Sequence, residues 1–222
     1  MRSKMKKAVL IFSGGVDSTT LLYELLDNNY EVFPVTFFYG QRHKREIDYA
    51  KKTILELGLK NWIGYPLTAL GKIGGSALTD DIAVPEGNYD EDSMKDTVVP
   101  NRNMILLSFA MAHAIRVGVL DIYYGAHAGD HAIYPDCREA FVDAMKVVAK
   151  VCHYEPINIE APYLHMTKES IVERGLVLGV NYANAWTCYK GEALACGKCG
   201  SCTERLEAFA LNGEKDPIEY IA

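Results

Sequence analysis

The chain has 222 residues, a formal net charge of -6 at pH 7 and six cysteines. A chain of this length is most simply one domain with a full hydrophobic core and room for a small appendage. The charge argues against a broad nucleic-acid surface, which needs excess Lys and Arg, and no apolar run is long enough to span a bilayer. We therefore expect a cytoplasmic protein with a small-molecule substrate, whose cysteines serve a metal or catalysis instead of disulfides.

The first predicted elements are a strand, a glycine loop and a helix. Residues 8–12 form an unbroken apolar run, and residues 20–26 carry apolar residues at helical spacing. Two adjacent glycines between them allow a tight turn with positive φ, and the unpaired N–H groups of the helix end favour a phosphate. The loop has neither the lysine of a Walker A loop nor the third glycine of a dinucleotide-binding loop. The segment reads Ser13-Gly14-Gly15-Val16-Asp17-Ser18-Thr19-Thr20.

The chain after this loop alternates predicted strands and helices. This alternation predicts an α/β fold, an open and mostly parallel sheet flanked by helices. Ligands bind at the carboxyl ends of the strands in such sheets, so the polar segments 39–43, 125–136 and 165–168 are expected beside the glycine loop. Residues 70–100 lack clear periodicity, which is typical of a functional loop or lid. Strands are expected at 31–39, 62–67, 121–126 and 156–160, and helices at 44–57, 103–117, from about 138 to 151, and 167–178.

Four cysteines in the last part of the chain form a metal-binding pattern. Two-residue gaps let neighbouring thiolates converge on one ion, and four sulfurs satisfy tetrahedral Zn²⁺ without an open position. An iron–sulfur cluster is the alternative, but the Cys-Pro that would complete a ferredoxin-like run is absent. We therefore favour a structural Zn²⁺ site. Its ligands would be Cys188, Cys196, Cys199 and Cys202.

These cysteines suggest a division of the chain into two units. Residues 1–185 would form an α/β domain that carries the glycine loop, and residues 186–222 a small zinc-binding segment. Two cysteines stand outside the cluster. Cys152 lies beside apolar residues and is expected in the core, whereas Cys137 borders the predicted ligand edge and could serve either packing or the site.

The motifs resemble those of the PP-loop ATP pyrophosphatases and, among them, the 7-cyano-7-deazaguanine synthases of queuosine biosynthesis. The glycine loop matches the SGGxDS pattern of the superfamily, and the narrower resemblance covers nearly the whole chain. Val16 departs from it, because this family often has Gln there. The segments that carry it are Tyr39-Gly40-Gln41-Arg42-His43, Val99-Pro100-Asn101-Arg102-Asn103, Tyr134-Pro135-Asp136-Cys137-Arg138, Thr187-Cys188-Tyr189 and the closing cysteines.

The resemblance implies an ATP-dependent ligase that uses ammonia to turn the carboxylate of 7-carboxy-7-deazaguanine into a nitrile through adenylated intermediates. It also implies ATP, Mg²⁺, Zn²⁺ and a homodimer. Asp17 would bind Mg²⁺ or order the loop, Lys168 would bind phosphate, and Arg102 would join them in catalysis. The residues implied to bind ATP are Phe12, Ser13, Gly14, Gly15, Val16, Asp17, Ser18, Thr19 and Thr20.

Further candidates for substrate binding follow from side-chain chemistry. Arg42 and Arg102 carry guanidinium groups that can hold a phosphate or a carboxylate bidentately. Asp130 and Asp136 could accept hydrogen bonds from the donor edge of a deazapurine, although Asp136 is equally a helix N-cap. Tyr134 is placed with them as a substrate-binding residue.

Proton transfer and the competing functions stay open at this point. His43, His127 and His131 are possible proton shuttles, and nothing in the sequence singles out one of them. One rival function is a PP-loop enzyme that adenylates a tRNA base, such as a thiolase or modification ligase, which predicts a basic RNA surface. Another is a zinc-ribbon module for nucleic acid, which leaves the glycine loop unexplained.

Overall fold

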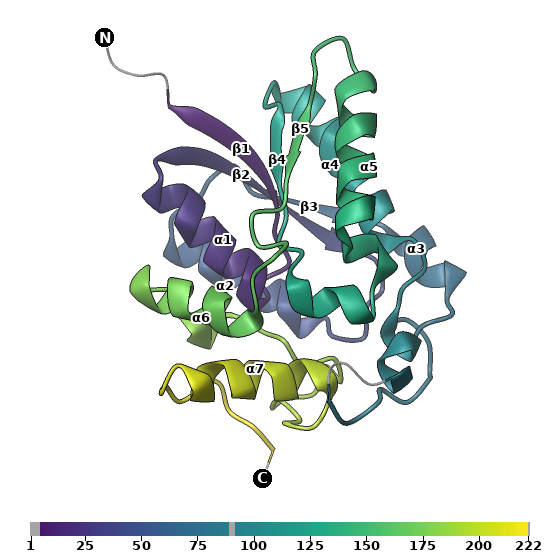
Figure 1. The fold of residues 1–222 in the computed structure, drawn as a ribbon, viewed down its shortest axis with the longest axis vertical. Coiled ribbons are helices and arrows are strands. Elements are labelled where there is room, and N and C mark those ends of the chain that lie inside the picture. Colours follow the sequence, from purple (N-terminus) through teal and green to yellow (C-terminus); the bar gives the residue numbers. More distant parts are fainter. Residues whose placement is uncertain (1–4, 89–91, 222) are drawn as a thin grey trace.

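The computed structural model describes residues 5–88 and 92–221, so the remaining residues, including 89–91 of the predicted lid, lie outside the description. A sheet of five parallel strands, in the order β3-β2-β1-β4-β5, forms its centre (Figure 1). The α/β prediction is therefore confirmed. The strands are β1 (Lys6–Ile11), β2 (Tyr30–Phe38), β3 (Ile63–Pro66), β4 (Asp121–Tyr123) and β5 (Asn158–Glu160).

Helices cover both faces of the sheet. Successive side chains of β1 point to opposite faces: Val9 packs in a core with Leu107 of α4 and Met145 of α5, whereas Leu10 packs with residues of α1, α2 and α6. Figure 1 shows α1, α2 and α6 on one side of the sheet and α4 and α5 on the other. The helices are α1 (Val16–Asp27), α2 (Arg45–Glu56), α3 (Thr68–Ile73), α4 (Arg102–Val117), α5 (Glu139–Val151), α6 (Lys168–Val177) and α7 (Gly200–Leu211).

Several boundaries differ from those the sequence predicted. Helix α1 begins at Val16, four residues before the first periodic apolar position, because Gly15 in extended conformation (φ -79°, ψ 173°) turns directly into the helix. Strand β4 stops at Tyr123, and the residues that follow leave the sheet to line a cavity. Helices α3 and α7 were not predicted. None of the described helices combines the length and apolar character needed to cross a membrane.

The cysteine-rich segment, which begins at residue 186 and includes α7, packs against α1 and α6. Phe209 of α7 shares a small core with Val16 of α1 and Val172 of α6. The backbone N–H of Trp186 donates to the carbonyl of Gly14 at 2.9 Å, which ties this segment to the glycine loop. The boundary between residues 185 and 186 as a domain division stays a prediction.

An internal ion pair fixes α7 to the last part of the chain. Arg205 is fully buried, and its Nε and Nη2 donate to the carboxylate of Asp216 at 2.6 and 2.8 Å. Its remaining donors reach the carbonyls of Tyr182 and Ala185 and the hydroxyl of Thr187. The segment from residue 182 to 187 is thereby held against α7.

The expectation for Cys152 is wrong. It ends α5 as the C-cap and is exposed, with its thiol directed at the carbonyl of Ala149. The apolar residues around it in the sequence belong to an exposed helix end, where Val151 is 77% exposed. Local apolar character therefore did not indicate burial here.

Candidate active site

A cavity lies at the carboxyl edge of the sheet, beyond the ends of β1, β2 and β4. Its walls come from six separate parts of the chain, which lie within the segments 11–18, 37–46, 102–106, 124–137, 168 and 186–204. The predicted convergence of polar segments after the strands therefore does occur. The cysteine-rich segment, which the sequence placed in a separate unit, also contributes to the wall through Trp186, Thr187, Tyr189, Ser201 and Glu204.

The glycine loop is pinned between the sheet and α2. Gly14 has a φ of 91°, and a Cβ at this position would lie 2.6 Å from the carbonyl oxygen of Glu46 and 2.7 Å from the backbone nitrogen of Ala50. Both the conformation and the contact with the α2 backbone require glycine. The shape of the loop is therefore set in part by its packing against α2.

The hydroxyl groups of the loop face its own backbone. Ser13 Oγ accepts from the N–H of Gly15 at 3.1 Å, and Ser18 Oγ accepts from the N–H of Gly14 at 3.3 Å. Both serines line the cavity together with Phe12, Gly15, Val16 and Asp17. Gly14, Thr19 and Thr20 do not line it. Thr20 instead bonds the hydroxyl of Tyr182 at 2.7 Å, so its side chain holds α1 against the neighbouring segment.

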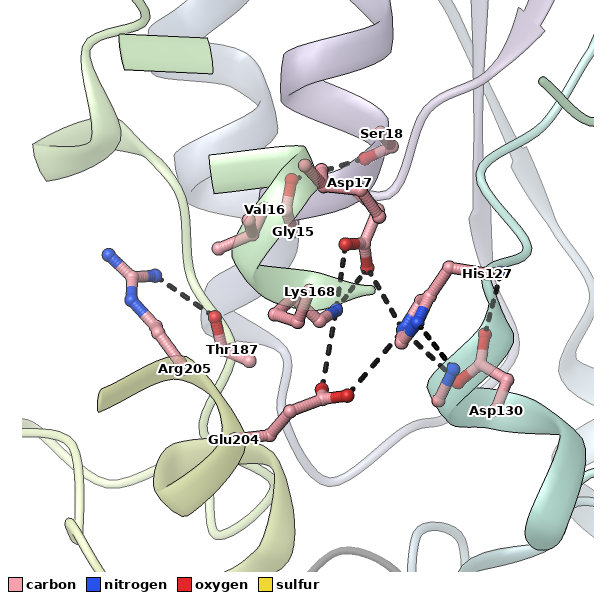
Figure 2. Close-up of polar contacts among 12 residues, drawn as sticks. Gly15, Val16, Asp17, Ser18, His127, Asp130, Lys168, Thr187, Glu204 and Arg205 are labelled. Carbon is pink, nitrogen blue, oxygen red and sulfur yellow. Dashed lines mark hydrogen bonds and ion pairs between the residues drawn. The ribbon is translucent and has the colours of Figure 1, made fainter. Parts of the chain in front are cut away.

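Lys168 and Asp17 form an ion pair at the centre of the site. Lys168 opens α6 directly after Thr167, whose hydroxyl caps that helix by accepting from the N–H of Ser170. The Nζ of Lys168 donates to both carboxylate oxygens of Asp17 at 2.7 Å. Glu204 of α7 approaches the same ammonium at 3.4 Å, and Figure 2 shows the two carboxylates on either side of it.

His127 lies next to this pair on the loop that follows β4. Its Nε2 is 3.5 Å from Asp130, 3.9 Å from Asp17 and 3.9 Å from Glu204. The other ring nitrogen, Nδ1, accepts from the N–H of Gly129 at 3.1 Å. That contact leaves the proton on Nε2, which faces the carboxylates (Figure 2).

Burial and charge act in opposite directions on these groups. Burial lowers the pKa of Lys168, but the nearby charges of Asp17 and Glu204 outweigh it, so the pKa is raised and the ammonium stays charged. Burial raises the pKa of Glu204, and the charge of Lys168 works against that shift. Three carboxylates, including Asp130, surround one ammonium and one imidazole, so the cluster has more acidic than basic groups.

The opposite end of the cavity is aromatic. Arg102, at the start of α4, places its guanidinium 5.7 Å from the ring centre of Tyr134. The hydroxyl of Tyr134 bonds Thr97 at 2.7 Å and Tyr189 at 3.2 Å. No described carboxylate lies within ion-pair distance of Arg102, although Tyr39, Tyr134 and Asp136 raise its pKa against the effect of burial. This end therefore holds a half-buried cation that has no carboxylate within ion-pair distance among residues 5–88 and 92–221.

Two buried polar side chains, Tyr124 and Cys137, also line this end of the cavity. Tyr124 is 5% exposed, and its hydroxyl has no hydrogen-bond partner among the described residues. Cys137 accepts from the amide of Asn103 at 3.1 Å, and burial and then Asp130 raise the pKa of its thiol well above its ordinary value. A thiol that resists deprotonation is a poor nucleophile, so this environment does not favour Cys137 as a nucleophile.

The remaining predicted substrate residues divide into two groups. Asp130 and Tyr134 line the cavity, whereas Arg42 and Asp136 do not. The guanidinium of Arg42 donates to the backbone carbonyl of Asp80 and to the carboxylate of Asp81. Asp136 accepts from the backbone N–H of Asn103, so it caps α4 across the fold instead of its own helix. Their predicted substrate contacts stay predictions that this geometry does not favour.

The predicted proton shuttles occupy different places. His43 lines the cavity, is 5% exposed, and has Nε2 3.2 Å from the carboxylate of Glu46. His127 belongs to the charged cluster described above. His131 lies outside the lining residues of the cavity.

The four clustered cysteines converge as their spacing predicted. Their sulfur atoms lie within 4.8 Å of one another, and those of Cys196 and Cys202 are 3.9 Å apart. Four thiolates around one Zn²⁺, with bonds of about 2.3 Å, would be about 3.8 Å apart. Backbone N–H groups of Lys198 and Cys199 point at the sulfur of Cys196, as expected for a thiolate. The donor set therefore fits a single tetrahedral metal ion.

Sequence reasoning missed several residues of the wall, above all Glu204 and Glu46. Glu204 follows Cys202 in a segment read only as metal ligands, and the spacing of Ala208 and Phe209 was the available sign of a helix there. Glu46 lies on the predicted helix 44–57, but nothing in its local pattern separates it from a solvent-facing residue.

The chain matches a known protein family. The family model described as "Queuosine biosynthesis protein QueC" matches residues 7–213. The 7-cyano-7-deazaguanine synthase of Hahella chejuensis is 54% identical over 215 residues, covering 96% of this chain and 93% of that protein. The enzyme of the same name from Caldicellulosiruptor bescii is also 54% identical, covering 96% of this chain and 97% of its own.

Among solved structures, the fold is similar to that of more distant proteins. A 4-thiouridine synthetase in an RNA complex with bound ATP has a TM-score of 0.51 and 19% identity, covering 79% of this chain and 41% of that one. A predicted subunit of a tRNA methyltransferase from Methanocaldococcus jannaschii has a TM-score of 0.50 and 12% identity, covering 98% and 93%. At these identities the likeness concerns the fold alone.

Proposed function

This chain belongs to the family of queuosine biosynthesis proteins QueC, and from that membership we propose that it is an ATP-dependent carbon–nitrogen ligase. The reaction converts 7-carboxy-7-deazaguanine and ammonia to 7-cyano-7-deazaguanine. The observation that carries the proposal is one cavity that is lined by both the glycine loop and a half-buried cation, Arg102, which lies in aromatic surroundings. Such a cavity suits a nucleotide and a planar carboxylate side by side.

The chemistry requires the carboxylate to be activated twice. Its oxygen first attacks the α-phosphorus of ATP, and pyrophosphate leaves. Ammonia then adds to the acyl carbon, AMP leaves and one proton is lost, which gives the amide. A second ATP adenylates the amide oxygen with loss of pyrophosphate and a proton. Release of AMP with the last N–H proton leaves the nitrile.

The charged end of the cavity is suited to the departing pyrophosphate. The N–H groups at the start of α1 and the ammonium of Lys168 supply positive charge where negative charge develops. We assign ATP binding to Ser13, Gly15, Asp17 and Ser18, with Phe12 and Val16 as apolar wall. Gly14 shapes the loop and Thr20 anchors α1, so both support the ATP site without facing it.

The aromatic end is suited to the deazapurine. Arg102 can hold the substrate carboxylate as a bidentate partner until adenylation removes its charge. Tyr134 and Tyr39 offer ring faces for a flat heterocycle, and Asp130 lies between the two ends as an acceptor for its amino groups. Of the histidines, His43 and His127 both line the cavity. His43 can accept a proton lost from nitrogen, because its Nδ1 has no partner among the described residues, whereas both ring nitrogens of His127 are already in use.

Two metal ions accompany this proposal. Mg²⁺ neutralises charge on ATP phosphates when bound, and the excess of carboxylates around Asp17 fits a site that receives a cation together with the nucleotide. Zn²⁺ fits the four converging thiolates of Cys188, Cys196, Cys199 and Cys202 and would fix the start of α7. A single ion accounts for sulfur atoms this close together.

The setting follows from the resemblance and the composition. We infer a cytoplasmic homodimer that acts on a small molecule and not on nucleic acid, in keeping with the net charge of -6. The alternative, adenylation of a tRNA base, takes its support from the fold shared with the 4-thiouridine synthetase. Salt-dependent retention of tRNA by the purified protein separates the two, since the ligase reading expects none.

The test is mass spectrometry of the products formed with ATP, Mg²⁺, ammonium and 7-carboxy-7-deazaguanine. The proposal expects the nitrile, with two AMP and two pyrophosphate for each molecule formed. Formation of AMP without the nitrile, or no turnover in metal-replete protein that still binds ATP, would contradict the proposed substrate.

A further inference from the structure

Glu204 is a charged residue of the cavity that the proposal above counts only as part of the excess of carboxylates around Asp17, without a role of its own. It belongs to α7, whose N-cap is Cys199 and whose first turn holds Cys202. Only 14% of its side chain is exposed, and its Oε2 lies 3.4 Å from the ammonium of Lys168. A carboxylate buried next to a phosphate-binding site repels the ligand, so its presence there requires a compensating role.

The surroundings of Glu204 are built to admit its carboxylate. A Cβ on Gly129 would lie 2.6 Å from Glu204 Oε1, so the backbone after β4 passes close to this oxygen. Oε1 also lies 3.9 Å from Nε2 of His127. The carboxylate is thus flanked by groups from two other parts of the chain and is mostly withdrawn from solvent.

Lys168 would bind differently without this second carboxylate. An ammonium has three N–H donors, and both oxygens of Asp17 lie 2.7 Å from it. Asp17 alone would hold the ammonium against the start of α1. Glu204 lies on the other side, as Figure 2 shows, and keeps the ammonium between the two carboxylates. Its contact at 3.4 Å is an ion pair and not one of the hydrogen bonds that the described residues make to this ammonium, so the third N–H is left for another partner.

We propose that Glu204 is a positioning residue, supplied by the cysteine-rich segment, that holds the Lys168 ammonium in place to contact the phosphates of ATP. The role rests on the proposed function, because it takes Lys168 to be a phosphate contact. It also explains why a metal-binding segment is joined to the wall of a nucleotide site: Cys199 and Cys202 fix the start of the helix that carries Glu204.

The test compares Glu204→Gln with Glu207→Gln, a neutralised glutamate that lies exposed on the same helix. In Glu204→Gln the ammonium moves towards Asp17, so we expect kcat to fall about ten-fold. The KM for ATP should stay unchanged or decrease, because one negative charge near the phosphates is gone. Glu207→Gln should match the unmodified protein in both constants.

A merely structural role for Glu204 would give another pattern. It would lower kcat only together with the unfolding temperature, and kcat would recover when the assay is cooled. An unchanged kcat in a folded Glu204→Gln protein, or a raised KM with normal kcat, would overturn the proposal. Glu204→Asp keeps the charge but is one methylene shorter, so it should fall between the unmodified protein and Glu204→Gln.

A second readout needs no turnover. The ¹⁵N-labelled ammonium of Lys168, assigned through Lys168→Arg, should give a protected NMR signal that shifts when an ATP analogue with a methylene bridge between the α and β phosphates binds. Glu204→Gln should lose this protection, while Glu207→Gln should keep it. Protection that persists in Glu204→Gln would overturn the positioning role. Absence of the nitrile from the unmodified protein would instead contradict the proposed substrate and leave this measurement intact.

Discussion

Glu204 and Arg205 are neighbours on α7, and they meet opposite environments. Arg205 points into the protein, where a carboxylate, two carbonyls and a hydroxyl receive its N–H groups at 2.6 to 3.1 Å. Glu204 points into the cavity, where it shares the ammonium of Lys168 with Asp17 at the longer distance of 3.4 Å (Figure 2). One polar network is closed, and the other is open to a ligand.

The difference teaches how to separate structural from functional charges in a buried setting. A network whose donors and acceptors are all used within the chain has nothing left to offer a substrate, so its value lies in stability. The cavity network has surplus carboxylates around Lys168 and a guanidinium, Arg102, that has no carboxylate partner among the described residues. Unequal charge of this kind is costly in an empty protein and useful when a ligand completes it.

The closed network should give the largest effect. Arg205→Met leaves the buried carboxylate of Asp216 without its cation, so the free energy of unfolding should fall by about 3–5 kcal/mol. Guanidinium denaturation followed by circular dichroism measures this loss. The double variant Arg205→Met/Asp216→Asn removes the orphaned charge and should recover part of it. A loss below about 1 kcal/mol in Arg205→Met would show that the network is not a structural element.

The open network should affect turnover. Lys168→Met removes the cation that we propose to contact the phosphates of ATP, and kcat for pyrophosphate release should fall about 100- to 1000-fold, the loss typical of a removed transition-state donor. It should also lower stability, since Asp17 and Glu204 lose their partner. Lys168→Arg keeps the charge, so it should restore stability but not turnover, because a planar guanidinium does not replace a compact ammonium. Restored turnover in Lys168→Arg would mean that charge alone is required.

The smallest effect should come from two buried tyrosines, one with an unpartnered hydroxyl at the cavity wall and one whose hydroxyl is bonded within the chain. Tyr124→Phe removes a hydroxyl that has no partner in the described structure, and the free energy of unfolding should rise by about 1 kcal/mol. Tyr163→Phe is the control, because its hydroxyl donates to Glu24 at 2.7 Å and its loss should destabilise by about 1 kcal/mol. Equal signs in the two variants would contradict the view that the hydroxyl of Tyr124 is unsatisfied in the folded protein.

The parts of the fold with strong local signals were predictable from the sequence. The apolar run of β1 predicted a strand, and the apolar spacing of α4 predicted a helix. The alternation of such elements then implied the parallel sheet. Helix α7 was missed because its first turn is occupied by metal-ligand spacing, which hides the helical pattern. Strand β4 was predicted too long because Tyr124 and Ala126 continue its apolar run in the sequence. In the structure these two residues line the cavity and do not belong to the strand.

Features of the site that depend on one segment of the chain could be predicted, whereas features that depend on contacts between distant segments could not. The glycine loop and the position of Lys168 at a helix start could be read locally. Nothing local tells that Arg42 turns away to Asp81 or that Asp136 caps a helix remote in sequence. Those outcomes depend on long-range packing, which a single sequence does not display.

The hydrogen bond from Trp186 to Gly14 joins the beginning of the site to a part of the chain that is synthesised much later. On the ribosome, the glycine loop emerges long before the segment that carries Trp186 and Glu204. A nascent chain can form the first parallel strands while its nucleotide site still lacks one wall. ATP cleavage therefore becomes available only after nearly all of the described chain has been made, and a prematurely terminated product would hold the loop without the means to use it.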